Sequence, residues 1–543
     1  MTPARSDQAA GRSGARPERE VRTAAASSNV RATGTAAGGT AAAPDPVGLP
    51  RGFGVEFDAD TRELSDGSLF GGSPARVLRL TPAGAAALAE LRAGPVRSAA
   101  ASALARRLTD AGLAHPVPPR HASRPDQADA GEAATSAVTV LVPVRDRAVM
   151  LDRCLSAAGS QHPVVVVDDG SADPAAIAAI AARHHARVVR RDTSGGPALA
   201  RNAGLAEVAT DIIAFLDSDC VPPPGWTGDL VAHFADPLVG AVAPRVVASA
   251  PAGPGRSAAA DYAAACGSLD LGDRPAPVRP GSRVSYAPTA ALIVRRAALD
   301  SLGAGHEVFD TALRYGEDVD LIWRLVSRGW RVRYDPAVCV PHKGPDTWAG
   351  LLERRFRYGT SAAPLARRHP DSMAPLVLHP WPAIAVAAVL GGRPVAAGAS
   401  TVAAWLDITS AVRRAGVPAD GAPAAALTAV RETWLGIGRY ATQFAAPALA
   451  LALARPGGTS PRRRLRRRVA VASLLLGPAL NDYARRRPEL DPVRFTLARI
   501  ADDVSYGAGV WASCLRERTV LPVRPAISRR PVRITRPASN GKD

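Results

Sequence analysis

Two aspartates separated by one residue, Asp217 and Asp219, directly follow the apolar run at residues 212–216. Carboxylates spaced in this way at the end of a strand point in the same direction and can share a divalent cation. Mg²⁺ and Mn²⁺ prefer such oxygen ligands, and they also bridge phosphate groups. Surface turns often carry the same pattern. The pair alone therefore predicts a Mg²⁺ or Mn²⁺ site, with a surface turn as the alternative.

A second acidic pair, Asp168 and Asp169, follows another apolar run. A carboxylate at a strand end can accept hydrogen bonds from the imide N–H of uracil or from ribose hydroxyls. The same stretch also suits the start of a helix, because Ser171 can cap it.

Further along, two glycines at residues 195–196 precede a predicted helix that carries Arg201. A helix start with a fixed guanidinium suits a diphosphate.

A third acidic stretch, Glu317-Asp318, lies about one hundred residues after Asp217. A carboxylate near an acceptor hydroxyl is what an inverting displacement requires as its general base. The alternative is a charged start of the helix that follows. His342 stands at the end of a further apolar strand and could complete the coordination shell of a cation, although an isolated histidine is more often structural.

These residues are positioned by a regular alternation of strands and helices that begins at Val138. The pattern predicts strands at residues 138–142, 164–167, 187–190 and 212–216, with helices between them. Strands separated by helices in this way indicate an α/β fold with a parallel sheet covered on both faces. Ligands bind at the carboxyl ends of the strands in such sheets, and both aspartate pairs fall there.

Five stretches in this order, VPVRDR, VVVDDGS, GGPALARNAG, FLDSD and GED, resemble the family 2 glycosyltransferases, which have the GT-A fold. The resemblance covers roughly residues 138–359. It implies a nucleoside-diphosphate-sugar donor, a divalent metal (Mg²⁺ or Mn²⁺) and inversion at the anomeric carbon. By motif, it assigns donor binding to Pro143, Arg145, Asp168, Asp169 and Arg201. It assigns metal binding to Asp217, Asp219 and His342. The catalytic carboxylates would be Asp318, as the base, and Glu317.

Processive members of this family carry a Q-x-x-R-W element after the base. The nearest counterpart here begins at Arg354, with arginine in place of glutamine and Tyr358 in place of tryptophan. Addition of several sugars therefore stays open. We expect Arg357 and Tyr358 from this element, together with Arg324, on the acceptor or product side.

The region before the transferase stretch has the order strand, helix, helix and short extended end. Thr81 and Pro82 suit the cap and first residue of the first helix, and a second helix is predicted at residues 99–111. This outline is that of a winged-helix module, and its order resembles the peptide-binding modules related to the PqqD chaperone. The alternative is a packing appendage with no ligand of its own.

The whole arrangement resembles the mycofactocin-system glycosyltransferases of actinobacteria, on the stretches LPRGFGVEFD, LFGGSPARVLRLTPAG and LRYGEDVDLIWRL. The resemblance implies transfer of glucose from UDP-glucose onto mycofactocin or its peptide-derived precursor, building a short β-linked glucan. It also implies that the N-terminal module contacts the precursor.

The predicted organisation has six parts. These are a disordered segment at 1–45, a winged-helix/PqqD-like module at 46–118, a linker at 119–136, a GT-A domain at 137–360, a helical, apolar and arginine-rich region at 361–520, and a basic tail at 521–543.

The net charge of +18 is concentrated in the last third of the chain, where arginines cluster at residues 462–468. Such a basic end suggests an anionic partner. The apolar runs of this region are short and interrupted by proline, which favours interfacial or hairpin helices over a clean spanning helix. The alternative is a helical domain of a soluble enzyme that closes over the acceptor. We therefore expect membrane association with the catalytic domain cytoplasmic. Five widely spaced cysteines suit a reducing compartment, and the polar N-terminus shows no secretory signal.

Two rival functions use the same residues differently. A lipid-phosphate or cell-wall glycan acceptor would suit the apolar C-terminal third. A winged-helix nucleic-acid-binding regulator would use the module and the basic tail, but the predicted helix at residues 82–91 is nearly all apolar. Nucleic-acid binding would also leave the acidic motifs without a role, so we expect no nucleic-acid partner.

Overall fold

The computed structural model describes residues 48–119, 138–249, 257–303, 307–414, 418–456, 460–528 and, for the backbone alone, 533–535. All of these belong to one compact unit, Thr40–Asp543. The segment predicted at 1–45, nearly all of the linker predicted at 119–136 and most of the basic tail predicted at 521–543 lie outside the described residues. The predicted domain boundaries stay predictions.

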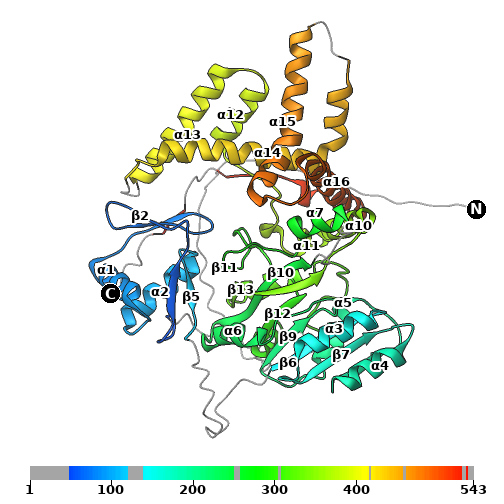
Figure 1. The fold of residues 1–543 in the computed structure, drawn as a ribbon. Helices are drawn as coiled ribbons and strands as arrows, with labels where there is room; N and C mark the ends of the chain where they lie inside the picture. Colours follow the sequence, from blue (N-terminus) through cyan, green and yellow to red (C-terminus); the bar gives the residue numbers. More distant parts are fainter. Residues whose placement is uncertain are drawn as a thin grey trace, which may run out of the picture. The chain divides into compact units, whose positions relative to one another are not determined.

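The described part of the catalytic region is built on an eight-stranded sheet in the order β11-β13-β10-β12-β9-β6-β7-β8 (Figure 1). Its strands are β6 (Val138–Val144), β7 (Val164–Asp169), β8 (Arg187–Arg191), β9 (Ile212–Leu216), β10 (Val239–Ser249), β11 (Ala276–Pro277), β12 (Ala291–Arg295) and β13 (Arg331–Lys343). The first four pair in parallel, as predicted. β12 runs antiparallel to both β9 and β10, so the sheet as a whole is mixed.

Helices cover both faces of this sheet. Leu141 packs into one hydrophobic cluster, whereas its neighbours Val140 and Val142 pack into a second cluster. Successive side chains of a strand point to opposite faces, so continuous valine and isoleucine runs fill two cores at once. The covering helices are α3 (Ala148–Ala158), α4 (Pro174–Arg183), α5 (Pro197–Leu205), α6 (Trp226–Ala232), α7 (Ala258–Cys266), α8 (Arg296–Asp300) and α9 (Glu317–Ser327).

The N-terminal module has its own core between two helices and short strands. Both predicted helices are present, and each begins at a hydroxyl cap, since the side chains of Thr81 and Ser98 accept from backbone N–H groups of the first turn. The elements are β1 (Gly54–Phe57), β2 (Arg62–Glu63), β3 (Leu69–Gly71), β4 (Arg76–Leu78), α1 (Pro82–Ala93), α2 (Ala99–Ala111) and β5 (Ala114–Val117), and the backbone of β16 (Arg533–Thr535) pairs with β4. The winged-helix and peptide-binding interpretation stays a prediction.

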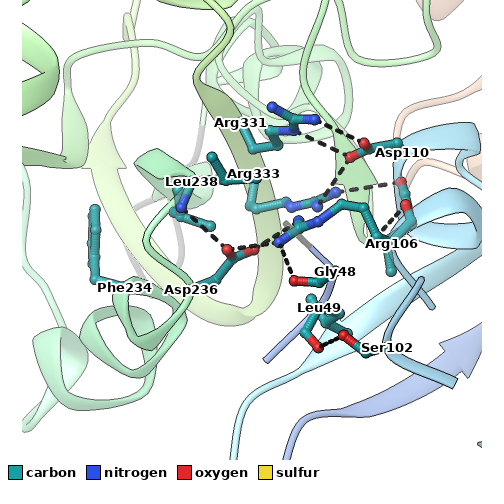
Figure 2. A network of polar contacts seen from close by, with 12 residues as sticks. Gly48, Leu49, Ser102, Arg106, Asp110, Phe234, Asp236, Leu238, Arg331 and Arg333 are labelled. Atoms are coloured by element: carbon teal, nitrogen blue, oxygen red, sulfur yellow. Dashed lines mark hydrogen bonds and ion pairs between the residues drawn. The ribbon is translucent and has the colours of Figure 1, made fainter. Parts of the chain in front are cut away.

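The module is fixed to the catalytic domain by ion pairs, one of which is buried (Figure 2). Both terminal nitrogens of Arg106 donate to the carboxylate of Asp236, at 2.8 and 2.7 Å, and both side chains are almost fully buried. Asp110 pairs with Arg331 of β13 at 3.0 Å. Removing one partner of a buried pair such as the first costs about 3–5 kcal/mol, so this contact holds the module in one position.

The region after the sheet is largely helical, as predicted. It contains α10 (Trp348–Gly359), α11 (Ala362–Arg368), β14 (Val377–Leu378), α12 (Pro380–Leu390), α13 (Pro394–Arg414), α14 (Ala422–Ala454), α15 (Pro461–Arg486), α16 (Pro492–Glu517) and β15 (Ala526–Ile527). α16 approaches α10 closely, because a Cβ on Gly509 would lie 2.0 Å from the carbonyl oxygen of Phe356. The C-terminal helices are therefore packed directly onto the helix that carries the predicted acceptor residues.

Among the described residues, one helix, α13, is long and apolar enough to cross a membrane by length and composition. It has a mean hydropathy of 1.3 over its most apolar window. A single helix of this kind is weak support for spanning, and the predicted membrane association stays a prediction.

Candidate active site

A cavity of about 650 Å³ lies at the carboxyl ends of β9 and β13. It brings together residues from stretches that are far apart in the sequence. Of the predicted site residues, it is lined by Arg201, Asp217, Asp219, Glu317, Asp318, His342, Arg357 and Tyr358. Pro143, Arg145, Asp168, Asp169 and Arg324 are not among the residues that line it.

The turn that carries the two aspartates is tied to neighbouring strands by its backbone. Asp217 N donates to Ala290 O at 2.9 Å, and Lys343 N donates to Asp219 O at 3.0 Å. The backbones of Cys220 and His342 form an isolated antiparallel β-bridge. These bonds place the imidazole Nε2 of His342 3.6 Å from Oδ2 of Asp219, although the two residues are more than one hundred positions apart.

Two arginines neutralise the acidic cluster. Nη2 of Arg201 donates to Oδ1 of Asp217 at 2.8 Å, and its Nη1 donates to Oε1 of Glu317 at 2.8 Å. Arg147 Nη1 donates to Oδ2 of Asp219 at 2.6 Å. Sequence reasoning chose Arg145 from the same loop and missed Arg147. The only signal in the sequence was that Arg147 belongs to the matched VPVRDR stretch.

The side chains of Asp217, Asp219 and His342 are suitable ligands for a divalent cation. Both carboxylates, however, are turned toward arginines. As the side chains stand, the described residues hold no group of three or more Asp, Glu, His or Cys side chains arranged around a metal. Asp219 and His342 do face each other, and Asp217 lies in the same cavity. Burial lowers the pKa of His342, which favours the neutral imidazole that a metal requires. Two carboxylates and one imidazole leave room for phosphate oxygens as further ligands.

Asp318 lies in the first turn of α9, which begins after Gly316. Its Oδ1 accepts from the N–H of Val319 at 2.8 Å, and no other hydrogen bond or ion pair from the described residues occupies the carboxylate. Burial, reinforced by the charge of Glu317, raises the pKa of Asp318 to about 7. A carboxyl group with this pKa can accept a proton near neutral pH.

Three acidic side chains of α9 point in three different directions. Glu317 binds Arg201, Asp318 faces the cavity, and Asp320 accepts from Arg324 Nε at 2.7 Å and contacts His369 at 2.8 Å. Each residue of a helix turns by about 100°, so close neighbours point apart. Arg324 also donates to the carbonyl of Val308, so the structure turns this predicted acceptor-side residue away from the cavity.

A further part of the cavity lining is aromatic and basic. It is formed by Tyr286, Tyr315, Trp323, Arg354, Arg355, Arg357, Tyr358 and Tyr506. The rings of Tyr315 and Tyr358 meet edge to face with centroids 6.4 Å apart. Tyr506 comes from α16 and was not predicted, because nothing in its local sequence marks a helix residue as part of a distant cavity. Such a wall offers aromatic faces and hydrogen-bond donors to a polar acceptor.

The predicted nucleoside-side residues lie at the ends of β6 and β7, next to the glycine pair. Both oxygens of Asp168 are occupied, by the N–H of Ser171 at 2.9 Å and by Arg190 at 2.6 Å. Asp169 accepts from the backbone of Gly196 at 2.8 Å, which fixes the start of α5. Pro143 is half-buried and Arg145 is exposed. The sequence correctly placed these residues at one edge of the sheet.

Comparison with known proteins agrees with this architecture. A sequence profile of glycosyl transferase family 2 matches residues 139–300. The chain is 39% identical over 488 residues to the pre-mycofactocin glycosyltransferase of Mycobacterium tuberculosis, covering 88% of this chain and 98% of that protein. It is 28% identical over 233 residues to glycosyltransferase AglE of Haloferax volcanii, covering 41% of this chain and 71% of that one.

Among solved structures, a mannosyltransferase from Pyrobaculum calidifontis in complex with GDP-Man and Mn²⁺ matches with 21% identity and a TM-score of 0.39. That match covers 70% of this chain and 86% of the other. The identity to the mycobacterial protein extends over nearly all of its length, including the regions before and after the matched profile. The chain therefore belongs to the family 2 glycosyltransferases of GT-A fold, nucleotide-sugar-dependent enzymes, and within them to the group that includes the pre-mycofactocin glycosyltransferase.

Proposed function

We propose that this enzyme transfers glucose from UDP-glucose onto mycofactocin or its peptide-derived precursor during mycofactocin biosynthesis, with inversion, and that it builds a short β-linked glucan. The observation that carries the proposal is the 39% identity across 98% of the pre-mycofactocin glycosyltransferase. The aromatic wall beside Asp318 supports an acceptor with polar and ring-like parts.

Asp318 is proposed as the general base. Its carboxylate would take the proton from the acceptor hydroxyl while that oxygen bonds to the anomeric carbon and the bond from this carbon to the diphosphate breaks. A single displacement of this kind inverts the configuration at carbon. Glu317 would act indirectly, by holding Arg201 in place through the 2.8 Å bond between them.

The sugar donor would lie across the turn that carries Asp217 and Asp219. Arg201 and Arg147 would bind the diphosphate, because each presents a guanidinium at the cavity wall. Pro143, Arg145, Asp168 and Asp169 would form the nucleoside side. Mg²⁺ or Mn²⁺ would be held by Asp217, Asp219 and His342. A bound cation would neutralise the charge on the leaving diphosphate.

The donor assignment is tested by donor hydrolysis without acceptor. Purified enzyme with Mg²⁺ or Mn²⁺ should release UDP from UDP-glucose faster than it releases nucleoside diphosphate from UDP-N-acetylglucosamine or GDP-mannose. Preference for either of the other two donors would overturn the glucose assignment and leave the transferase assignment intact.

A second acceptor class is favoured by one observation. The C-terminal helices expose many large apolar side chains, among them Trp381, Ile384, Trp405 and Leu476. A lipid phosphate or a cell-wall glycan presented at a membrane would suit such a surface. Product formation with polyprenyl phosphate, and none with pre-mycofactocin, would favour this alternative.

We also propose that the enzyme attaches to the cytoplasmic face of the membrane through two helical hairpins, α12–α13 and the end of α14 with α15 (Figure 1). Residues 433–481 contain eight arginines and no acidic residue, and residues 372–406 also contain no acidic residue. Arg466 of the second hairpin donates to the carbonyl of Gly391 in the first at 2.6 Å. Apolar side chains beside purely cationic ones favour an anionic lipid surface.

Replacing Arg462, Arg463 and Arg464 by Gln should weaken binding to vesicles of phosphatidylglycerol and phosphatidylcholine by about 10²-fold, because each arginine near an anionic surface contributes about 1 kcal/mol. Sedimentation with vesicles measures this. The charge-matched control replaces Arg153, Arg183 and Arg187, three exposed arginines of the catalytic domain. Binding that is equal on pure phosphatidylcholine, or equally reduced in the control, would contradict the hairpin surface.

A further inference from the structure

Residues 267–290 connect α7 to β12 and include β11, the edge strand that pairs with β13. Both ends of this segment line the active-site cavity, with Ser268 and Leu269 at one end and Ser285 and Tyr286 at the other. The hydroxyl of Tyr286 donates to the carbonyl of Ser268 at 3.1 Å and ties the two ends together. The two ends of the segment thus form part of the cavity wall, and its middle carries the edge strand β11.

The middle of the segment is held on one side by β13 and is also bonded to the N-terminal module. Arg279 Nη1 donates to the carbonyl of Asp110 at 2.6 Å, and its Nη2 donates to the carbonyl of Ser73 at 2.9 Å. The hydroxyl of Ser73 accepts from the backbone N–H of Arg283 at 2.6 Å. Three polar contacts therefore connect one short turn of the segment to two separate parts of the module.

Asp58 of the module provides a second hold. Its buried carboxylate accepts from Arg274 at 2.5 Å and from Arg283 at 3.4 Å, and it bonds to His115 at 2.9 Å. Burial alone would raise the pKa of Asp58, but the bond to His115 and the two arginines lower it. The carboxylate is thus ionised at neutral pH and anchors two arginines of the segment.

The wall formed by this segment adjoins the proposed base. The indole nitrogen of Trp323 donates to the carbonyl of Ser285 at 2.7 Å, and Trp323 lies on the same helix as Asp318. Burial, with the nearby charge of Asp318, raises the pKa of the Tyr286 phenol. The segment therefore faces the acceptor half of the cavity.

We infer that the N-terminal module shapes the acceptor wall of the active site, with Asp58 and Arg279 as positioning residues that hold the 267–290 segment. The inference rests on the proposed function, because the wall is identified as the acceptor side by its closeness to Asp318. It gives the module a part in acceptor binding that does not depend on a peptide bound to the module itself.

The test compares three charge-removing variants at one interface. Asp58→Asn and Arg279→Gln each weaken the bonds between the module and the segment, whereas Arg331→Gln removes a module–domain ion pair outside it. With pre-mycofactocin as acceptor, the first two should raise the acceptor KM about 10-fold, since a misplacement of 1 Å can cost of order 10²-fold. Donor-only hydrolysis should be unchanged in all three. Arg331→Gln should lower the Tm without raising the acceptor KM.

Hydrogen–deuterium exchange provides a readout that needs no acceptor. Exchange in residues 267–290 should increase in Asp58→Asn and Arg279→Gln but not in Arg331→Gln. Should Asp58→Asn fail to fold, Arg279→Gln carries the test alone. Unchanged exchange, or an acceptor KM that rises equally in all three variants, would overturn the inference. If the unmodified enzyme does not hydrolyse the donor, that result would instead count against the proposed function.

Discussion

Replacement of Asp318 by Asn is expected to lower the rate of sugar transfer by about 10²–10⁴-fold, the range that a general base contributes. Asparagine has nearly the same shape but cannot accept the acceptor's proton at neutral pH. The affinity for UDP should stay unchanged, because Asp318 forms no hydrogen bond to Arg201 or to the turn that carries Asp217 and Asp219. Transfer measured by product formation and UDP binding measured by calorimetry separate the two effects.

The pH dependence follows from the raised pKa of Asp318. Only the ionised carboxylate can act as base, so kcat/KM of the unmodified enzyme should rise with pH and level off above about 7. The folded pKa lies above the ordinary value of 3.8, so the stability that this group contributes at low pH is lost as pH rises through the folded pKa. Asp318→Asn should therefore show an equal or higher Tm at pH 8, with no such gain near pH 4.

The matched control for this prediction is Asp320→Asn on the same helix. Asp320 is buried against Arg324 and His369 and does not line the cavity, so its replacement should lower the Tm but leave the turnover of folded enzyme near normal. Turnover retained in Asp318→Asn, or lost equally in both variants, would remove Asp318 from the role of base.

Replacement of Asp219 by Asn is expected to abolish metal-dependent UDP binding and to lower transfer on the order of 10³-fold, because a divalent cation contributes several kcal/mol of charge stabilisation. Asp219 lies 3.6 Å from the imidazole of His342, and the pair is the part of the proposed metal site that the fold already brings together. Calorimetry of UDP with and without Mn²⁺ measures the effect directly.

The control for the metal prediction is Asp229→Asn, an exposed aspartate in the first turn of α6. It should bind UDP and Mn²⁺ like the unmodified enzyme. Chelation with EDTA should reduce the unmodified enzyme to the level of Asp219→Asn. Equal UDP affinity with and without metal, in both the unmodified enzyme and the variant, would contradict a metal site at the acidic turn.

Much of the catalytic region could be predicted from sequence because its signals are local. The valine and isoleucine runs of β6, β7 and β9 can only be buried on both faces, and their carboxyl ends must share one edge. Asp217 and Asp318 both line the cavity at this edge, because the chain returns to it. The predicted helices of the module were recovered for the same reason, since Thr81 and Pro82 are local helix-start signals.

What could not be predicted depends on pairs of residues far apart in the sequence. Arg147 and Asp219 are 72 positions apart, and Arg106 and Asp236 are 130 apart. In an arginine-rich chain no local pattern marks which arginine finds a partner. Arg324 was expected on the acceptor side, but the helix places it on a different side from Asp318, where it binds Asp320.

The most direct test of the central claim is mass spectrometry of products formed from UDP-glucose, Mg²⁺ or Mn²⁺, and pre-mycofactocin by the purified enzyme. We expect a ladder of hexose additions with the unmodified enzyme and none with Asp318→Asn. A single addition would keep the acceptor and remove the glucan. No addition to pre-mycofactocin, with UDP-glucose still hydrolysed, would contradict the proposed acceptor while leaving the family 2 transferase in place.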